Sequence, residues 1–236
     1  MKFNTKKEFE YCIEKGHYIE LNLVCEEKID TLPKNNNNVI IRFTCTNNIL
    51  RDVSNIFSFK HLKFLDLSHN IITFIDLSNL VLLEELNLSH NQLNTLILGD
   101  IDKLITLNAS HNKLTDIDLN KLSNIKILDL SYNNITALPI VKNETLKEIN
   151  MEYNGLKYFK LYETLYPDVL ILNGNKEFEF FNILFVKVKQ LFIQNMGLKE
   201  IPYIIPNMRE EVLLINAKDN DIQKIPEWIE KCIIIK

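Results

Sequence analysis

The stretch LKFLDLSHNIITFIDLSNL at residues 62–80 decides the fold, because its pattern returns along the chain, for example as IKILDLSYNNITALPI at residues 125–140. Asparagines recur within this pattern at equal steps of 21 residues: Asn70, Asn91, Asn112, Asn133, Asn154 and Asn175. The apolar residues around each asparagine keep the same offsets, which gives the frame L-x-x-L-x-L-x-x-N-x-L. Self-similarity at a fixed period indicates a repeat architecture.

The central L-x-L of the frame alternates apolar and polar residues, as a strand with one buried face does. A single unit cannot bury its apolar face alone, so we expect neighbouring strands to stack in parallel over one continuous core. Looser copies of the frame precede residue 62 and follow residue 175. Together they predict about nine or ten strands.

The frame resembles that of the leucine-rich repeat family, and the resemblance covers roughly residues 18 to 236. It implies an α/β solenoid of a 21-residue subclass, with a curved parallel β-sheet on the concave face and short helical or irregular convex segments. It also implies that the recurring asparagine bonds backbone groups of neighbouring turns, for which an amide has both donors and an acceptor. The expected ladder comprises Asn48, Asn70, Asn91, Asn112, Asn133, Asn154, Asn175 and Asn220. Met196 stands where an asparagine is expected, so we predict local irregularity there.

Three segments are predicted along the chain. Residues 1–17 form an N-terminal capping helix, because Thr5 and Glu8 make a capping-box pattern and Gly16 is a natural stop. Residues 18–225 form the solenoid of about nine units, and residues 226–236 form a C-terminal cap or a final edge strand. An aromatic segment is expected to pack on the convex side; its members are Phe178, Phe180, Phe181, Phe185 and Phe192.

Composition narrows the classes of partner. The formal net charge is −4, the hydrophobic content is 46%, and no uninterrupted apolar stretch is long enough to cross a membrane. A basic nucleic-acid-binding surface and a membrane partner are therefore not expected. The four cysteines are scattered without metal-binding spacing, which favours reduced thiols and a cytoplasmic location.

Two columns of residues are expected on the concave face, because like positions of parallel strands lie about 4.8 Å apart. We predict that both columns bind a partner. The column directly before the asparagines contains His69, His90, His111, Tyr132 and Tyr153. The column at the strand centres contains Asp66, Asn87, Asn108, Asp129 and Asn150.

These columns also allow two chemical alternatives. The three histidines could converge on Zn²⁺ with Asp66 nearby, but ladder residues point alongside each other and no cysteine joins them. Serines precede the histidines, which invites a Ser/His nucleophile, but catalytic groups occur once rather than once per repeat. No phosphate-binding loop or hydrolase motif occurs. We therefore expect no metal, no cofactor, no small-molecule substrate and no catalysis.

The sequence thus predicts a protein–protein recognition scaffold that binds a protein partner on its concave sheet. The alternative is an enzyme-regulatory part, either a phosphatase-regulating subunit or the recognition module of a longer catalytic chain.

Overall fold

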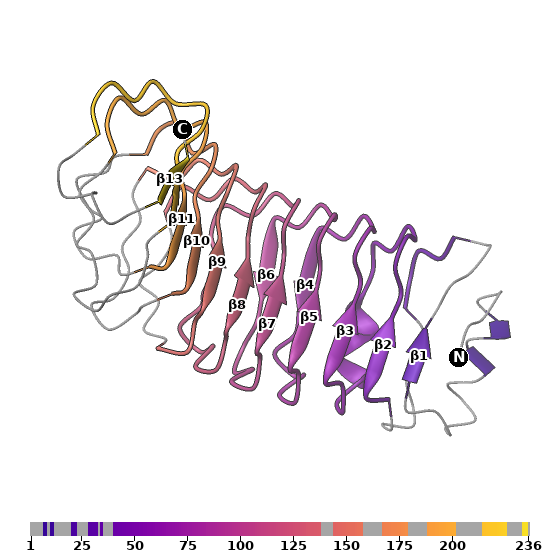
Figure 1. The fold of residues 1–236 in the computed structure, drawn as a ribbon. Coiled ribbons are helices and arrows are strands. Elements are labelled where there is room, and N and C mark those ends of the chain that lie inside the picture. Colours follow the sequence, from indigo (N-terminus) through magenta and orange to yellow (C-terminus); the bar gives the residue numbers. More distant parts are fainter. Residues whose placement is uncertain are drawn as a thin grey trace.

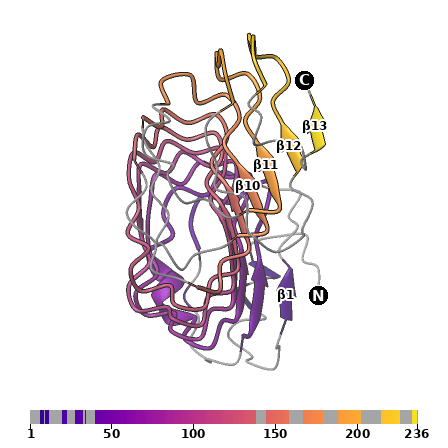
Figure 2. The same cartoon turned by 60° about the vertical axis from the view of Figure 1, so that its left-hand side comes forward.

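The computed structural model describes residues 7–8, 10–11, 20–22, 28–32, 34, 40–137, 144–157, 167–178, 188–201, 214–225 and 233–235. Over this part of the chain the backbone coils into a solenoid, with one turn for each sequence repeat (Figure 1). Figure 2 shows the main sheet as one wall of the coil and the return segments as the opposite wall.

In the described ranges, eleven short parallel strands form the main sheet and follow one another in chain order. They are β1 (Glu20–Asn22), β2 (Arg42–Thr44), β3 (Phe64–Asp66), β5 (Glu85–Asn87), β7 (Thr106–Asn108), β8 (Ile127–Asp129), β9 (Glu148–Asn150), β10 (Val169–Ile171), β11 (Gln190–Phe192), β12 (Leu214–Asn216) and β13 (Ile233–Ile235). The sheet exceeds the predicted nine or ten strands because β13 also pairs with β12.

The core lies directly behind this sheet. Strands β2, β3, β5 and β7 to β12 each bury their middle residue, and these residues stack in register, as in Leu65 beside Leu86 and Leu86 beside Leu107. Leu62 and Leu67, the other leucines of the first quoted unit, are fully buried as well. The frame read from the sequence therefore located the core, and the parallel solenoid that it predicted is confirmed.

The return side differs from the predicted α/β class, because it contains little helix. Its regular elements in the described residues are a 3₁₀ helix, η1 (Ser54–Ser58), and a two-stranded sheet of β4 (Phe74–Asp76) and β6 (Thr95–Ile97). The physical reason is visible in the sequence: Ile75 and Leu77 are buried and alternate with exposed residues, which is the period of a strand rather than of a helix.

The two ends are described only in part. Residues 7–8 and 10–11 are helical, within the segment predicted as a capping helix, whereas residues 226–232 lie outside the described residues. The boundaries at 1–17, 18–225 and 226–236 stay predictions. None of the helices in the described ranges has the length and hydrophobicity that a bilayer-spanning helix requires.

The aromatic segment was predicted to pack on the convex side, and the structure describes two of its five phenylalanines, Phe178 and Phe192. Phe178 is buried in the core, and Phe180, Phe181 and Phe185 lie outside the described residues. Phe192 does not pack on the convex side, because it is the last residue of β11 and pairs with Ile171 on the exposed face of the main sheet. Cys45 is buried and is in no disulfide among the described residues, and Cys12, Cys25 and Cys232 fall outside the described ranges.

Candidate functional site

Five aromatic rings from five successive turns form one continuous stack beside the main sheet. The ring centroids are 4.3 Å apart from His69 to His90, 4.1 Å from His90 to His111, 4.2 Å from His111 to Tyr132 and 4.7 Å from Tyr132 to Tyr153. Neighbouring planes differ by 8° to 23°. We call these five residues the ring column. The column that the sequence predicted therefore exists as a packed row of rings.

The backbone holds every member of the ring column in the left-handed region. Its φ angles run from 55° at His69 to 49° at Tyr153. Asn47 and Asn195 occupy the same position in other turns at φ 57° and 51°. Asparagine tolerates this conformation and histidine is enriched in it, whereas a bulky residue such as tyrosine is an outlier. The two tyrosines are thus held in a strained backbone conformation, a feature that clusters at functional sites.

The column that the sequence placed at the strand centres lies instead at the last residue of each strand, because the middle residue is the buried one. It also has a structural use that the sequence does not reveal. The side-chain Oδ1 of Asp66, Asn87, Asn108, Asp129 and Asn150 accepts the backbone N–H two residues later, at 2.9–3.1 Å. These Asx turns lead the chain from the strand towards the left-handed residue. All five side chains are half-buried, so they present less free polar surface than the predicted binding role assumed.

In three turns the hydroxyl of the serine directly before the ring column is already hydrogen-bonded. Ser89, Ser110 and Ser131 donate their hydroxyls to the Oδ1 atoms of Asn87, Asn108 and Asp129 at 2.7–2.8 Å. The serines preceding the ring column in these turns are buried. Because the hydroxyl proton is given to an Asx oxygen rather than to an imidazole, this arrangement does not form a Ser/His nucleophile.

The histidine geometry differs from that of a metal site. The rings of His69, His90 and His111 are within 9° and 12° of parallel, so their in-plane nitrogen lone pairs do not converge on one point. Within the described ranges, no group of three or more histidine, cysteine or carboxylate side chains is placed to hold a metal ion.

Packing shifts the pKa of two rings. The pKa of His90 is lowered by its burial between two turns and by the neighbouring His111 and His69. The pKa of Tyr132 is raised by burial, by the charge of Glu152 and by Tyr153. Both shifts favour neutral rings at physiological pH. Tyr132 and Tyr153 nevertheless stay 39% and 41% exposed, so their edges are open to a partner.

The recurring asparagines form hydrogen bonds between adjacent turns. Asn112 is typical: its Nδ2 donates to the carbonyls of Leu88, Ala109 and Ser110, and its Oδ1 accepts the N–H of Leu93 at 2.9 Å. The same bridging pattern, with one bond back to the preceding turn from each end of the amide, recurs at Asn70, Asn91, Asn133, Asn154, Asn175 and Asn220.

Two positions in the ladder, Asn48 and Met196, differ from this pattern. Asn48 accepts the N–H of Ile29 from the preceding turn, but its Nδ2 bonds within its own turn to Thr46 O and Cys45 Sγ. Met196 is buried at the empty rung, and its N–H is bonded to Asn220 of the following turn.

A third surface column was missed. The first residue of each strand also faces solvent, and there the guanidinium of Arg42 lies 3.9 Å from the ring centroid of Phe64. Ile127 in the same column is 41% exposed. From β10 onwards the exposed sheet face becomes mostly apolar, with Val169, Ile171, Phe192, Leu214 and Ile233. The column of aspartates and asparagines that ends at Asn150 continues with Ile171 and Phe192. This switch from polar to apolar residues was the sequence signal for the apolar part of the sheet face.

Comparison with known proteins agrees with this architecture. A family model described as Leucine Rich Repeat matches residues 61–81 and 82–104, and a second, described as Leucine Rich repeat, matches residues 121–138. No curated protein sequence matched the chain.

Several solved structures share the fold. The functional domain of InlJ from Listeria monocytogenes has 18% identity and a TM-score of 0.59, over 94% of this chain and 53% of that one. The LRIM1/APL1C complex has 22% identity and a TM-score of 0.60, over 85% and 43%. The leucine-rich repeat domain of APL1B has 20% identity and a TM-score of 0.58, over 87% and 62%. The chain thus spans between 43% and 62% of these structures, and at such identities the likeness concerns the fold.

Proposed function

Because this chain is a leucine-rich repeat protein with a 21-residue repeat, we propose that it is a non-enzymatic recognition scaffold that binds a protein partner on the exposed face of its main sheet. One structural relative, LRIM1/APL1C, is itself a complex. Proteins of this repeat class generally serve as interaction modules, and the chain fits that use.

The observation that carries the proposal is the strained position of Tyr132 and Tyr153. Both are bulky residues with φ near 50°, yet about two fifths of each side chain remains exposed. Asparagine occupies the same position at Asn47 and Asn195, so the fold does not require an aromatic ring there. Exposed aromatic residues beside polar ones are typical anchors of protein interfaces.

The apolar end of the sheet extends this surface. Val169 and Ile171 lie on β10, directly after the turn that carries Tyr153. A partner seated over β8 to β11 contacts two tyrosine edges, the half-exposed Ile127 and the apolar residues of β10 and β11. The charges beside them are mixed, with Lys126 and Lys147 near Glu148 and Glu152, which suits a protein better than nucleic acid.

The test uses the double variant Tyr132→Asn/Tyr153→Asn. Asparagine keeps the left-handed backbone and removes both rings, so stability should change by no more than about 0.5 kcal/mol. Partners are recovered by affinity capture with mass spectrometry, and their affinity is then measured with the wild type and the variant. We expect the affinity to fall by about 2 kcal/mol or more.

The matched control is Ile97→Ser, which removes an exposed apolar side chain from β6 on the return side. A recovered partner that binds the tyrosine variant normally and loses affinity for Ile97→Ser contradicts the assignment to the sheet face. The identity of the partner also separates the two functional classes, because recovery of a phosphatase would favour the regulatory alternative.

A further inference from the structure

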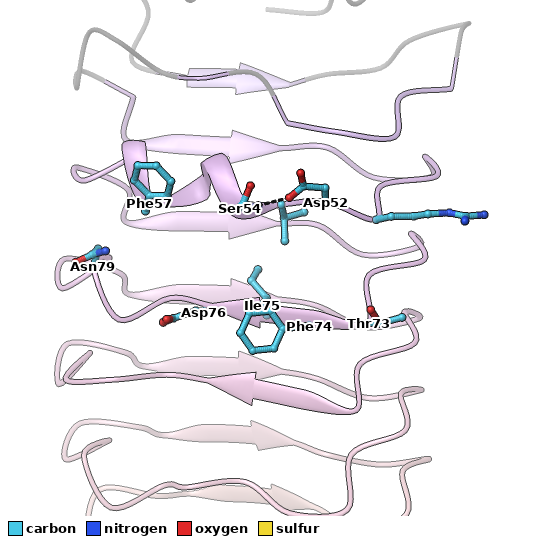
Figure 3. Close-up of a pocket in the computed structure, with 10 residues that line it drawn as sticks. Asp52, Ser54, Phe57, Thr73, Phe74, Ile75, Asp76 and Asn79 are labelled. Atoms are coloured by element: carbon cyan, nitrogen blue, oxygen red, sulfur yellow. Dashed lines mark hydrogen bonds between the residues drawn. The ribbon is translucent and has the colours of Figure 1, made fainter.

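A groove crosses the return side of the solenoid, on the wall opposite the main sheet. It lies between η1 and β4 and has a volume of about 530 Å³ (Figure 3). The buried residues Val53 and Ile75 line its base, and the rings of Phe57 and Phe74 are 47% and 50% exposed. Two half-exposed phenylalanines on one groove leave a large apolar area in water, which is typical of a contact surface.

The lining also carries negative charge. Asp52 and Asp76 each accept a backbone N–H two residues ahead, from Ser54 at 2.8 Å and from Ser78 at 2.9 Å. The hydrogen bonds from these serines lower the pKa of both carboxyl groups, so both are ionised at neutral pH. Arg51 lines the groove as well, but no ion pair joins it to either aspartate among the described residues, and the lining remains net negative.

The placement of rings and carboxylates is specific. Phe74 and Asp76 are the first and third residues of β4, so both project from its outer face while Ile75 points inwards. In Figure 3, Phe57, Asn79 and Asp76 lie towards one end of the groove, and Thr73 lies at the other. Phe57 and Asp76 thus bring an aromatic ring and a carboxylate to the same end of the groove.

We propose that this groove binds a cationic side chain, an arginine or lysine, in a basic segment of a partner protein. The aliphatic stem packs over Phe74 and the buried base, as long cationic side chains do on apolar surfaces. The charged head lies against the ring faces and the carboxylates, a combination of cation–π attraction and charge complementarity. The groove constitutes a second contact surface, independent of the sheet face.

The experiment is an NMR titration of the uniformly ¹⁵N-labelled chain with Nα-acetyl-arginine amide at constant ionic strength. Nα-acetyl-citrulline amide serves as the neutral analogue of the same shape. We expect saturable amide shifts at residues 52–57 and 73–79 with the arginine probe, at a Kd on the order of 10 mM. The citrulline probe should bind more weakly or not at all.

Two variants locate the site. Asp76→Asn keeps an Oδ1 acceptor for Ser78 and removes the charge, and Phe74→Ser removes the ring; each should weaken binding about two- to fivefold. Asp118→Asn is the matched control, because Asp118 accepts the N–H of Asn120 in the same kind of turn at 2.9 Å and does not line the groove. Equal binding of citrulline, equal weakening by Asp118→Asn, or no saturable shift with the arginine probe would each overturn the proposal.

Discussion

The ring of Tyr153 lies against the α-carbon side of Gly174, where a β-carbon would come within 2.6 Å of Cδ1 of that ring. Gly174 stands in the same column as the five rings, at φ 71°. The ring column therefore ends at Tyr153 because the next turn offers a residue without a side chain. The glycine leaves the tyrosine room to lie flat.

Gly174→Ala should destabilise the protein by more than the left-handed conformation alone costs, which is about 1 to 2 kcal/mol. The additional cost comes from the clash with Tyr153. Urea denaturation of Gly174→Ala and of Gly174→Ala/Tyr153→Asn measures the two parts, because the second variant removes the ring. An alanine cost that is the same with and without the ring would show that the clash contributes nothing.

Asn112→Leu should lower the free energy of unfolding by about 1 to 3 kcal/mol, because buried backbone groups of two turns lose their partner. Asn134→Leu is the control, since that asparagine is exposed and lies in the next turn. Urea midpoints provide the comparison. Equal midpoints for the wild type and Asn112→Leu would contradict the role of the ladder.

Met196→Asn should leave the stability unchanged or raise it. By the offsets of the other ladder residues, the new amide would bond the N–H of Glu177 and the carbonyl of Leu172 in the preceding turn. These bonds offset the loss of an apolar side chain that is 3% exposed. Thermal unfolding checks this, and a melting temperature several degrees lower would refute it.

Stability should fall as the pH drops below the ordinary histidine pKa near 6.5, because the pKa of His90 is lowered in the folded chain. Between the pKa of His90 in the folded chain and its ordinary pKa, the unfolded chain binds a proton at this residue and the folded chain does not. Protonation therefore favours unfolding. The dependence continues down to the folded pKa. Urea unfolding measures the free energy of unfolding at pH 7.5 and at pH 5. The decrease between the two pH values should be smaller for His90→Asn than for the wild type. An identical decrease would exclude His90 as its source.

The sequence was sufficient for the strands of the main sheet, the core and the ring column, because a fixed period places equivalent residues at equivalent positions. It did not predict the return-side strands β4 and β6. It was less informative where one residue type serves two purposes. The positions of Asp66 and Asn87 predict partner-binding groups, whereas their side-chain oxygens close Asx turns. Phe192 was assigned to the convex side as part of an aromatic run, although its place as the third residue of a strand puts it on the exposed face of the main sheet. The return-side groove has no sequence signature, since its walls come from two different turns.

Each bridging asparagine bonds backbone groups of the preceding turn and of no turn further away. Mechanical coupling along the solenoid therefore passes only between adjacent turns. At the turn of Met196 one such link lacks its amide, and cooperativity should weaken there, as it does between repeats with a poor interface. The turns after Met196 then unfold locally as a separate cooperative unit. Native-state hydrogen exchange should release the strand amides of β12 earlier than those of β5 to β8, and uniform protection along the sheet would show that the chain opens as a single block.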